Sequence, residues 1–370
     1  LADTVFPATD DNEVVAIDSH DAFDIMERDI LAAEDHIHAL FYIWRDDQTG
    51  RRFRDVLIES ARRGVRVRVL SDAFGSPAFS TRFVRPLKRA GVAVERFLPP
   101  RIFSPSPRIN FRNHRKILVI DGHIGFIGGF NVGDEYRTQW RDLGVRMRGP
   151  AVDQLQEIFA EDWYYASDEN LADKRYFGCW TRADDHANAH RVASIASGPD
   201  AESAPIEDAL FAAINMARQR IRLVTPYFVP TRSLLTALRS ARYRGVTVEV
   251  MVPSKSDVRI VRYASRSYYP ELLESGVRIY EYQPSMLHAK FATFDDELVL
   301  VGSANIDNRS FRLNFEASCV VAGPELNQTL NHVFDEDKLE CKRIEPADLA
   351  RLGPVQQLVD ATANLLSPLL

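Results

Sequence analysis

The chain has 370 residues, of which 45% are hydrophobic and 26% charged, and its net charge at pH 7 is −6. This length and composition are typical of a globular protein with room for two packed units of ordinary size. They exclude a low-complexity or fibrous chain, and no apolar run approaches the length that spans a bilayer. The acidic net charge weighs against a dedicated nucleic-acid binder.

The first half of the chain alternates between strand-like and helix-like segments. Residues 36–43 alternate as a strand, residues 51–63 follow as a helix, and residues 64–70 form a second strand-like run. A helical stretch then leads to a short strand at 91–94. Helices that alternate with β-rich runs predict an α/β fold in which helices cover the sheet.

The second half repeats this order of elements. Its opening strand is expected at 191–197. The matching elements that follow are a strand at 221–225, a helix at 232–244, a strand at 245–251 and a short strand at 276–279. An amphipathic helix is expected at 355–366, and an apolar tail follows it.

The polar, irregular stretch between the two sets of elements divides the chain. We therefore predict a first half at residues 1–170, a connection at 171–190 and a second half at 191–370. The repeated order of elements indicates that the two halves share one architecture.

The pattern H-x-K-x-x-x-x-D occurs at two places in the sequence. The two copies consist of His114, Lys116 and Asp121, and of His288, Lys290 and Asp295. An asparagine follows each histidine by 17 places and an acid follows it by 28 places. These residues are Asn131 and Asn305, and Asp142 and Glu316. Matched spacings in both halves predict one active site assembled from two related parts.

Each copy of the motif spans a predicted β-hairpin. In the first copy, an apolar strand at 116–120 meets the turn signal Asp121-Gly122 and returns at 124–127. The second copy has strands at 290–294 and 298–301 on either side of its turn. The motif includes its aspartate in the catalytic set. The position of that aspartate at the far hairpin tip favours a structural role in bracing the turn.

The residue types suit the displacement of an alcohol from a phosphodiester. One imidazole attacks phosphorus to give a covalent phosphohistidine, and a second, protonated imidazole donates a proton to the leaving alkoxide. Two lysines and two asparagine amides suit the non-bridging oxygens, whose charge must be stabilised in the transition state. Ser303, which has Gly129 at the matching position, adds a hydroxyl donor. We expect no metal, because the lysines supply the positive charge.

Two acids are predicted to orient the imidazoles. Asp142 and Glu316 are the expected partners of each ring's second nitrogen, where a carboxylate fixes the tautomer and the ring orientation. The alternative for both acids is a surface salt bridge.

The three cysteines Cys179, Cys319 and Cys341 are scattered, with no C-x-x-C pair and no Cys/His cluster at ligand spacing. They are typical of reduced, structural thiols in a protein facing the cytosol, and we expect neither a zinc site nor a cofactor.

Residues 51–116 carry a local excess of positive charge. They include 17 Lys and Arg against four Asp and Glu. This segment is either an ordinary solvated face or a surface that docks on anionic lipid headgroups, where each nearby cation contributes about 1 kcal/mol. The Pro-rich stretch 98–113 beside the first motif is expected to be a lid, a membrane-touching loop or a plain surface loop.

These residues resemble the phospholipase D superfamily, whose mark is a duplicated H-x-K-x-x-x-x-D, and within it the bacterial cardiolipin synthases. The resemblance covers nearly the whole chain. The segments that point to the synthase branch are Gly133-Asp134-Glu135-Tyr136 and Trp140-Arg141-Asp142. The resemblance implies two phospholipase D-like halves, each a mixed β-sheet flanked by helices, related by a pseudo-twofold axis with one shared active site.

The resemblance also implies a reaction. Two phosphatidylglycerol molecules would give cardiolipin and glycerol, with His114 as nucleophile and His288 as acid by the family's more common order. It implies a place at the cytoplasmic face of a bacterial cell membrane, either peripheral or anchored by an N-terminal segment outside this chain. The alternatives are a lipid hydrolase that forms phosphatidic acid, a nuclease-like phosphodiesterase, and a membrane-binding module without activity. The motif residues do not separate the synthase from the hydrolase.

Overall fold

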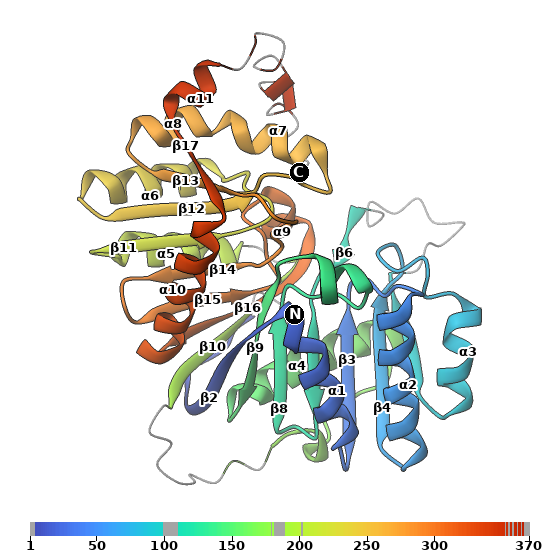
Figure 1. Ribbon diagram of the computed structural model, residues 1–370. Coiled ribbons are helices and arrows are strands. Elements are labelled where there is room, and N and C mark those ends of the chain that lie inside the picture. The colour runs from blue at the N-terminus through green and yellow to red at the C-terminus, as the bar shows by residue number, and fades with distance from the viewer. Residues whose placement is uncertain are drawn as a thin grey trace.

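The computed structural model describes residues 4–98, 110–178, 180, 189–200 and 203–351, and beyond these residues 353, 356, 359–360, 362–363 and 365 (Figure 1). Several expectations fall outside this part of the chain: most of the Pro-rich stretch 98–113, Cys179, half of the predicted helix 355–366, and most of the apolar tail that ends it.

The first half is built on a mixed β-sheet with strand order β5-β4-β3-β7-β8-β9-β2. The strands β3, β4 and β5 are parallel, and the other neighbours are antiparallel. The bounds are β2 Thr9–Asp18, β3 His36–Phe41, β4 Arg66–Asp72, β5 Ala93–Phe97, β7 Ile117–Ile120, β8 Ile124–Gly128 and β9 Leu143–Arg148.

The second half repeats this sheet strand for strand, in the order β13-β12-β11-β14-β15-β16-β10. Its bounds are β10 His190–Ser197, β11 Arg220–Val224, β12 Thr247–Pro253, β13 Arg278–Tyr282, β14 Phe291–Phe294, β15 Leu298–Gly302 and β16 Asn314–Ala322. An extra strand, β17 (Cys341–Ile344), pairs antiparallel with the outer strand β13. This order confirms the predicted α/β fold of two similar halves.

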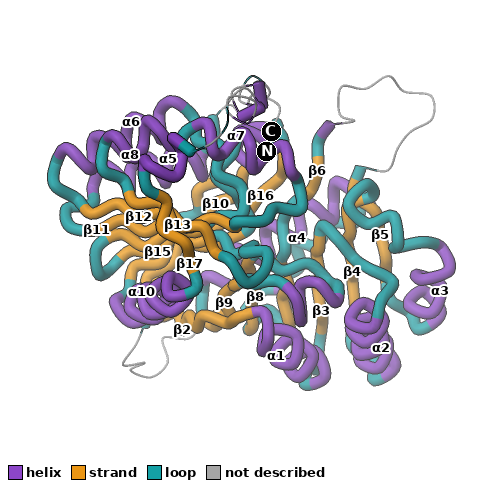
Figure 2. Tube along the Cα trace, turned by 45° about the horizontal axis from the view of Figure 1, so that its top comes forward, coloured by secondary structure: helices purple, strands orange, loops and turns teal. Residues whose placement is uncertain are grey.

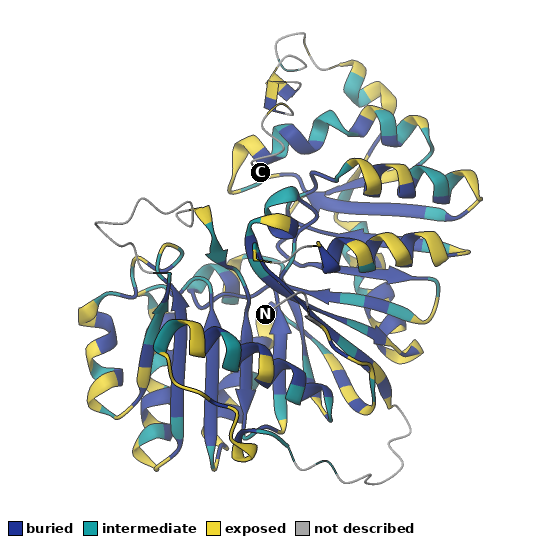
Figure 3. Cartoon of the chain, turned by 180° about the vertical axis from the view of Figure 1, so that it is seen from behind, coloured by how far each residue is buried: buried dark blue, intermediate teal, exposed yellow. Residues whose placement is uncertain are grey.

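Helices cover both sheets, as Figure 2 shows from above, and the strands between them are almost entirely buried (Figure 3). The first half has α1 Ser19–Leu31, α2 Gln48–Arg62, α3 Thr81–Arg89 and α4 Ala151–Ser167. The second has α5 Pro205–Met216, α6 Arg232–Tyr243, α7 Arg259–Ser267, α8 Tyr269–Glu274, α9 Asn308–Arg312, α10 Pro324–Leu339 and α11 Pro346–Ala350. Within the described residues, no helix is long and apolar enough to cross a bilayer.

The two sheets join through β2 and β10, the edge strands opposite β5 and β13. The strands β2 and β10 pair antiparallel, and the short strand β1 (Thr4–Val5) also pairs with β10. One hydrophobic cluster therefore spans both halves, with Val145 and Trp163 from the first half and Val299 and Phe334 from the second. A further cluster lies within each half. The shared core holds the two halves in a fixed relation, which a site between them requires.

The predicted elements are confirmed, with shifted ends. The helix expected at 51–63 begins at Gln48, because the side chain of Asp47 caps it by accepting the Gly50 N–H at 2.8 Å. The strands expected at 64–70 and 245–251 begin two residues later. Gly64 and Gly245 adopt φ of 101° and 91° just after the preceding helices, and this left-handed conformation ends a helix.

Candidate active site

The two copies of the motif meet where the halves touch each other reciprocally. The short strand β6 (Arg112–Asn113) pairs parallel with the start of β16, and the His114 N–H then donates to the carbonyl of Phe315 at 2.9 Å. In the other half the His288 N–H donates to the carbonyl of Arg141 at 2.7 Å. Phe315 and Arg141 occupy the same position in their repeats, so the contact is made twice with the halves exchanged. Such reciprocity is the signature of a twofold relation.

Each imidazole is held by a carboxylate of the opposite half. His114 Nδ1 lies 2.9 Å from Glu316 Oε1, and His288 Nδ1 lies 2.7 Å from Asp142 Oδ2. Both carboxylates are fully buried, and the side chains of His114 and His288 are 12% and 6% exposed. A buried carboxylate on Nδ1 fixes the ring and leaves Nε2 for chemistry.

Both motif lysines are buried beside their histidines. Lys116 Nζ donates to the carbonyl of His114. Lys290 Nζ donates to the carbonyl of His288 and lies 2.9 and 3.1 Å from the two ring nitrogens. Burial lowers the pKa of Lys116 to about 7 and that of Lys290 to about 8. A compact ammonium in a dry site is suited to an anionic oxygen.

The charges of the two half-sites act on each other. The pKa of His114 is lowered to about 4, first by burial and then by the charges of Lys116 and Lys290, against the opposing effect of Glu316. Burial also lowers the pKa of His288, with Lys290 and Lys116 adding to that effect and Asp142 opposing it. Each lysine thus reaches the histidine of the opposite half, as one shared site requires.

The asparagines lie at equivalent places with different partners. Asn131 Oδ1 accepts the N–H of Ile43 at 3.0 Å, and the Asn131 side chain also forms a hydrogen bond with the side chain of Tyr136. Asn305 Oδ1 is buried without a hydrogen-bond partner among the described residues. An unsatisfied buried carbonyl oxygen is a natural place for a ligand group that donates a hydrogen bond.

Ser303 contacts the orienting acid of its own half. Its hydroxyl donates to Glu316 Oε2 at 2.5 Å and accepts the Ala317 N–H at 3.0 Å. At the matching position, a Cβ on Gly129 would lie 2.1 Å from Asp142 Oδ1. In this structure, therefore, Ser303 supports Glu316, and its expected bond to the substrate phosphate stays a proposal.

The motif aspartates lie at the opposite ends of their hairpins. Asp121 accepts the N–H groups of Glu34, Asp35 and His36, and so fixes the start of β3. Asp295 does the same before β11, accepting the N–H groups of Arg218, Gln219 and Arg220. Four strand residues separate each aspartate from its lysine, about 16 Å at the usual strand rise. This arrangement favours the structural role for both aspartates over a place in the catalytic set.

Sequence reasoning assigned no role to the aromatic residues around the imidazoles. The ring of Tyr42 lies 4.8 Å from that of His114, and the rings of Trp140 and Tyr136 lie 5.2 and 5.5 Å from that of His288. The sequence contained one indication that an aromatic residue before each motif is part of the repeat. Tyr42 and Tyr227 occupy matching positions once the 11 extra residues between Gly91 and His114 are allowed for.

No group of three or more His, Cys, Asp or Glu side chains in the described ranges has the geometry of a metal site. Cys319 and Cys341 are free thiols. Apart from the two carboxylates that orient the rings, the charged side chains at the imidazoles are lysines, which suit an anionic substrate.

Comparisons with known proteins agree with this geometry. Residues 26–163 and 210–338 match the family described as cardiolipin synthase, PLD-like domain, one segment in each half. The chain is 41% identical to a cardiolipin synthase of Geobacillus kaustophilus over 362 residues, which is 96% of this chain and 72% of that protein. It is 39% identical to a cardiolipin synthase of Listeria innocua over 372 residues, covering 98% and 76% of the two chains.

The chain belongs to the cardiolipin synthase family of phospholipase D-like proteins. A solved structure supports the fold of this family member. The phosphatidylserine synthase of Haemophilus influenzae superimposes with a TM-score of 0.71 at 16% identity, over 99% of this chain and 97% of that one.

Proposed function

We propose that this member of the cardiolipin synthase family joins two phosphatidylglycerol molecules to give cardiolipin and glycerol. The observation that carries the proposal is the pair of buried imidazoles, each fixed through Nδ1 by a carboxylate of the opposite half. Two oriented imidazoles serve a reaction in which one alcohol leaves phosphorus and another replaces it.

In the first step, Nε2 of His114 attacks the phosphorus of the donor lipid. The phosphorus–oxygen bond to the glycerol headgroup breaks, and the protonated His288 gives its proton to the leaving oxygen. Lys116, Lys290 and the two asparagines hold the non-bridging oxygens. A bound phosphodiester anion raises the pKa of the nearby His288, and Asp142 at 2.7 Å stabilises its protonated form.

In the second step, the neutral His288 takes the proton from a headgroup hydroxyl of a second phosphatidylglycerol. That oxygen attacks the phosphohistidine, and the nitrogen–phosphorus bond to His114 breaks. Glu316 balances the positive charge that the phosphorylated ring of His114 carries. Because one phosphodiester is replaced by another, the exchange needs no external energy source.

The proposal extends to the surroundings of the enzyme. We infer that it works on an anionic membrane surface at the cytoplasmic face of a bacterial membrane, where both substrates reside. We also propose that the chain divides functionally at residues 171–190, with one half-site contributed by 1–170 and the other by 191–370.

Lipid product analysis tests the reaction. Purified protein is incubated with phosphatidylglycerol vesicles beside a His114→Ala control, and lipids and free glycerol are measured. We expect cardiolipin and glycerol in equal amounts from the unmodified chain and neither from the control. Phosphatidic acid alone would make the protein a hydrolase in practice, and products equal to those of the control would refute the proposal.

A further inference from the structure

Helix α3 carries a cluster of cations that differs from the rest of the basic segment 51–116. On α2, Arg51 pairs with Asp46 and Arg52 with Glu27. On β4, Arg68 pairs with Glu169. In contrast, within the part of the chain that the structure describes, none of the α3 cations forms a salt bridge with an acid. They are Arg82, Arg85, Lys88 and Arg89. The positive charge of this segment is therefore paired with acids along most of α2 and on β4. Among the described residues, the α3 cations lack such a partner, as does Arg62 at the end of α2.

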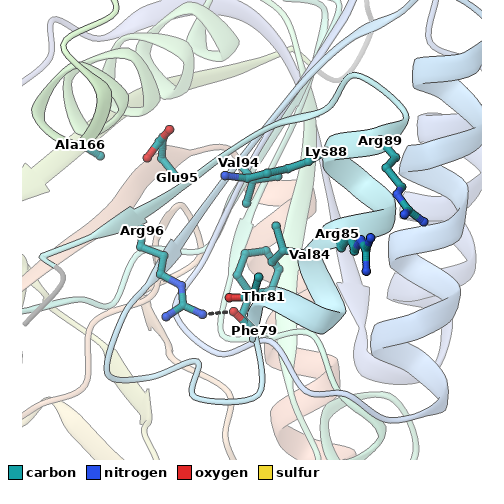
Figure 4. A pocket seen from close by; sticks show the side chains of 10 residues that line it. All are labelled: Phe79, Thr81, Val84, Arg85, Lys88, Arg89, Val94, Glu95, Arg96 and Ala166. Carbon is teal, nitrogen blue, oxygen red and sulfur yellow. Dashed lines mark hydrogen bonds between the residues drawn. The ribbon is translucent and has the colours of Figure 1, made fainter.

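The α3 cations stand beside a cavity. A cavity of about 580 Å³ lies between α3, β5 and the end of α4, within the size range of small-molecule sites. Arg85, Lys88, Arg89 and Arg96 line it, and Glu95 is the one acid among its described lining residues. Phe79 and Val84 are buried beneath it, with Arg85 and Arg96 on opposite sides of them (Figure 4). A hollow surrounded mainly by cations suits a ligand with an anionic head.

A second hollow provides an internal comparison. It has about 510 Å³ on α2 and is lined by Arg51 and Arg52, but also by Asp55 and Glu59. Mixed charges of this kind describe an ordinary solvated face. Two of the α3 cations, Lys88 and Arg89, lie in the last helical turn, where they also stabilise the helix dipole by about 0.3–1 kcal/mol each. That role does not account for Arg85, which lies outside that turn, whereas Arg96 on β5 donates to the carbonyl of Phe79.

The cavity lies beside β5, whose last residue, Phe97, is near the strand that holds Glu316. The parallel strands β3, β4 and β5 all end toward His114. Asp72 at the end of β4 accepts the N–H of Asn113, and Phe97 at the end of β5 packs 5.1 Å from the ring of Phe315. At the end of α4, beside the cavity residue Ala166, Tyr164 and Tyr165 are 52% and 50% exposed. Exposed tyrosines are typical of the level of lipid headgroups.

We propose that the α3 cavity binds the phosphate of an anionic phospholipid in the membrane, at a site separate from the catalytic one. The cations of α3 hold the phosphate, and Ala166 and the aliphatic stems of these cations contact the glycerol backbone and the first methylenes. The bound lipid is not consumed. It docks the first half on the bilayer, with the catalytic opening toward the layer that supplies the substrates. This assignment rests on the proposed function in one respect only, that the substrates are membrane lipids.

Vesicle sedimentation of the full chain tests the site. The variant Arg85→Gln/Lys88→Gln is compared with Arg62→Gln/Arg218→Gln, which removes the same charge from exposed positions at the opposite ends of the sheets. Vesicles contain phosphatidylcholine alone or with phosphatidylglycerol. We expect the α3 variant to bind the anionic vesicles about 30-fold more weakly, from about a fivefold loss per cation, and the control variant to stay within about twofold of the unmodified chain. Neither variant should change binding to phosphatidylcholine.

Equal binding of the two variants to anionic vesicles would overturn the proposal, as would an equal loss on both vesicle types. Turnover of short-chain phosphatidylglycerol dissolved as monomers should be unchanged in the α3 variant, and a loss there would place these residues in the catalytic machinery instead. The binding assay needs no turnover. If the protein makes no cardiolipin, the proposed function is refuted. A selective loss of binding in the α3 variant would still support the docking site in that case.

Discussion

The two half-sites share one motif but differ in how each imidazole is supported. His114 rests on Glu316, which also accepts a bond from Ser303. His288 rests on the shorter Asp142, whose carboxylate occupies the space that a side chain on Gly129 would need. The longer acid, Glu316, thus stands beside a serine, and the shorter acid, Asp142, stands beside a glycine. The two half-sites therefore hold their imidazoles in different ways.

The surroundings differ as well. Two aromatic rings, those of Tyr136 and Trp140, face His288, while Tyr42 faces His114. The His288 side chain is half as exposed as that of His114, at 6% against 12%. A duplicated motif therefore does not imply duplicated roles. The more exposed ring is the better placed to meet an incoming lipid phosphate, in keeping with His114 as the nucleophile.

Removing each imidazole gives the largest expected effect and tests the roles directly. We expect His114→Ala and His288→Ala to lower turnover by about 10⁴-fold or more, because nucleophile and acid are both essential. With a donor lipid whose leaving group needs no proton, His288→Ala should still form the phosphohistidine and His114→Ala should not. The measurement is radiolabel from the phosphate located by peptide mapping. A label found on His288 would reverse the two roles.

Lys116→Arg comes next in size. Lys116 is 2% exposed, and a planar guanidinium does not replace a point charge in a closed site. We expect turnover to fall by about 10²–10³-fold, the usual loss for one donor to a transition-state oxygen. Steady-state kinetics on dissolved short-chain lipid measure it, and Arg89→Lys serves as an exchange of the same kind at an exposed cation. Turnover equal to that of the unmodified chain would remove Lys116 from the site.

Because the two acids have different neighbours, exchanging serine and glycine at these two positions should have unequal effects on turnover. In Gly129→Ser, the new Cβ would lie 2.1 Å from Asp142 Oδ1, so Asp142 and with it His288 must move. A displacement of about 1 Å in an active site costs about 100-fold in turnover. Ser303→Gly removes one hydrogen bond to Glu316 without a clash, and we expect a loss of at most about tenfold. Equal losses would show that the two acids are supported alike.

The sequence revealed the repeated elements because their signals are local. Alternation over 36–43 and 221–225, together with a glycine after each following helix, needs no knowledge of the fold. The histidine, lysine and asparagine positions were available for the same reason, since the spacing itself repeats.

The sequence did not reveal that each acid contacts the histidine of the other half. Asp142 and Glu316 follow their own histidines by 28 residues in each repeat, and nothing in that spacing says that each serves the other half. The exchange follows from the pairing of β6 with β16 and of Arg141 with Leu287. The cavity beside α3 was equally hidden, because the basic segment mixes paired with unpaired cations.

The motif aspartates provide a smaller test, on stability rather than on rate. Asp121→Ala leaves three backbone N–H groups without their acceptor, and Asp295→Ala does the same in the other half. These groups lie near the surface, so we expect each change to lower the free energy of unfolding by about 1–3 kcal/mol. Turnover of the folded fraction at low temperature should stay within about threefold of the unmodified chain. A loss of turnover with unchanged stability would return the aspartates to the catalytic set.

The smallest expected effect concerns pH and again depends on the buried imidazoles. In the folded chain the pKa of His114 is lowered to about 4, mainly by burial, against about 6.5 for a histidine in water. Between these two values the unfolded chain binds the proton and the folded chain does not, so stability is complete above pH 6.5 and falls as the pH drops. Glu316 and Asp142 do not cause this loss, because each has a pKa below its usual value and stays ionised through the window.

From pH 6.5 to pH 5, His114 alone should lower the free energy of unfolding by about 2 kcal/mol. Denaturant unfolding at several pH values measures it, with His114→Gln as the comparison because glutamine does not titrate. The slope of stability against pH should be shallower in that variant, whatever its stability at pH 7. Equal slopes in the two chains would mean that His114 keeps an ordinary pKa. The carboxylate of Glu316 would then dominate its surroundings over burial, and the resting ring would carry the proton that a nucleophile must lack.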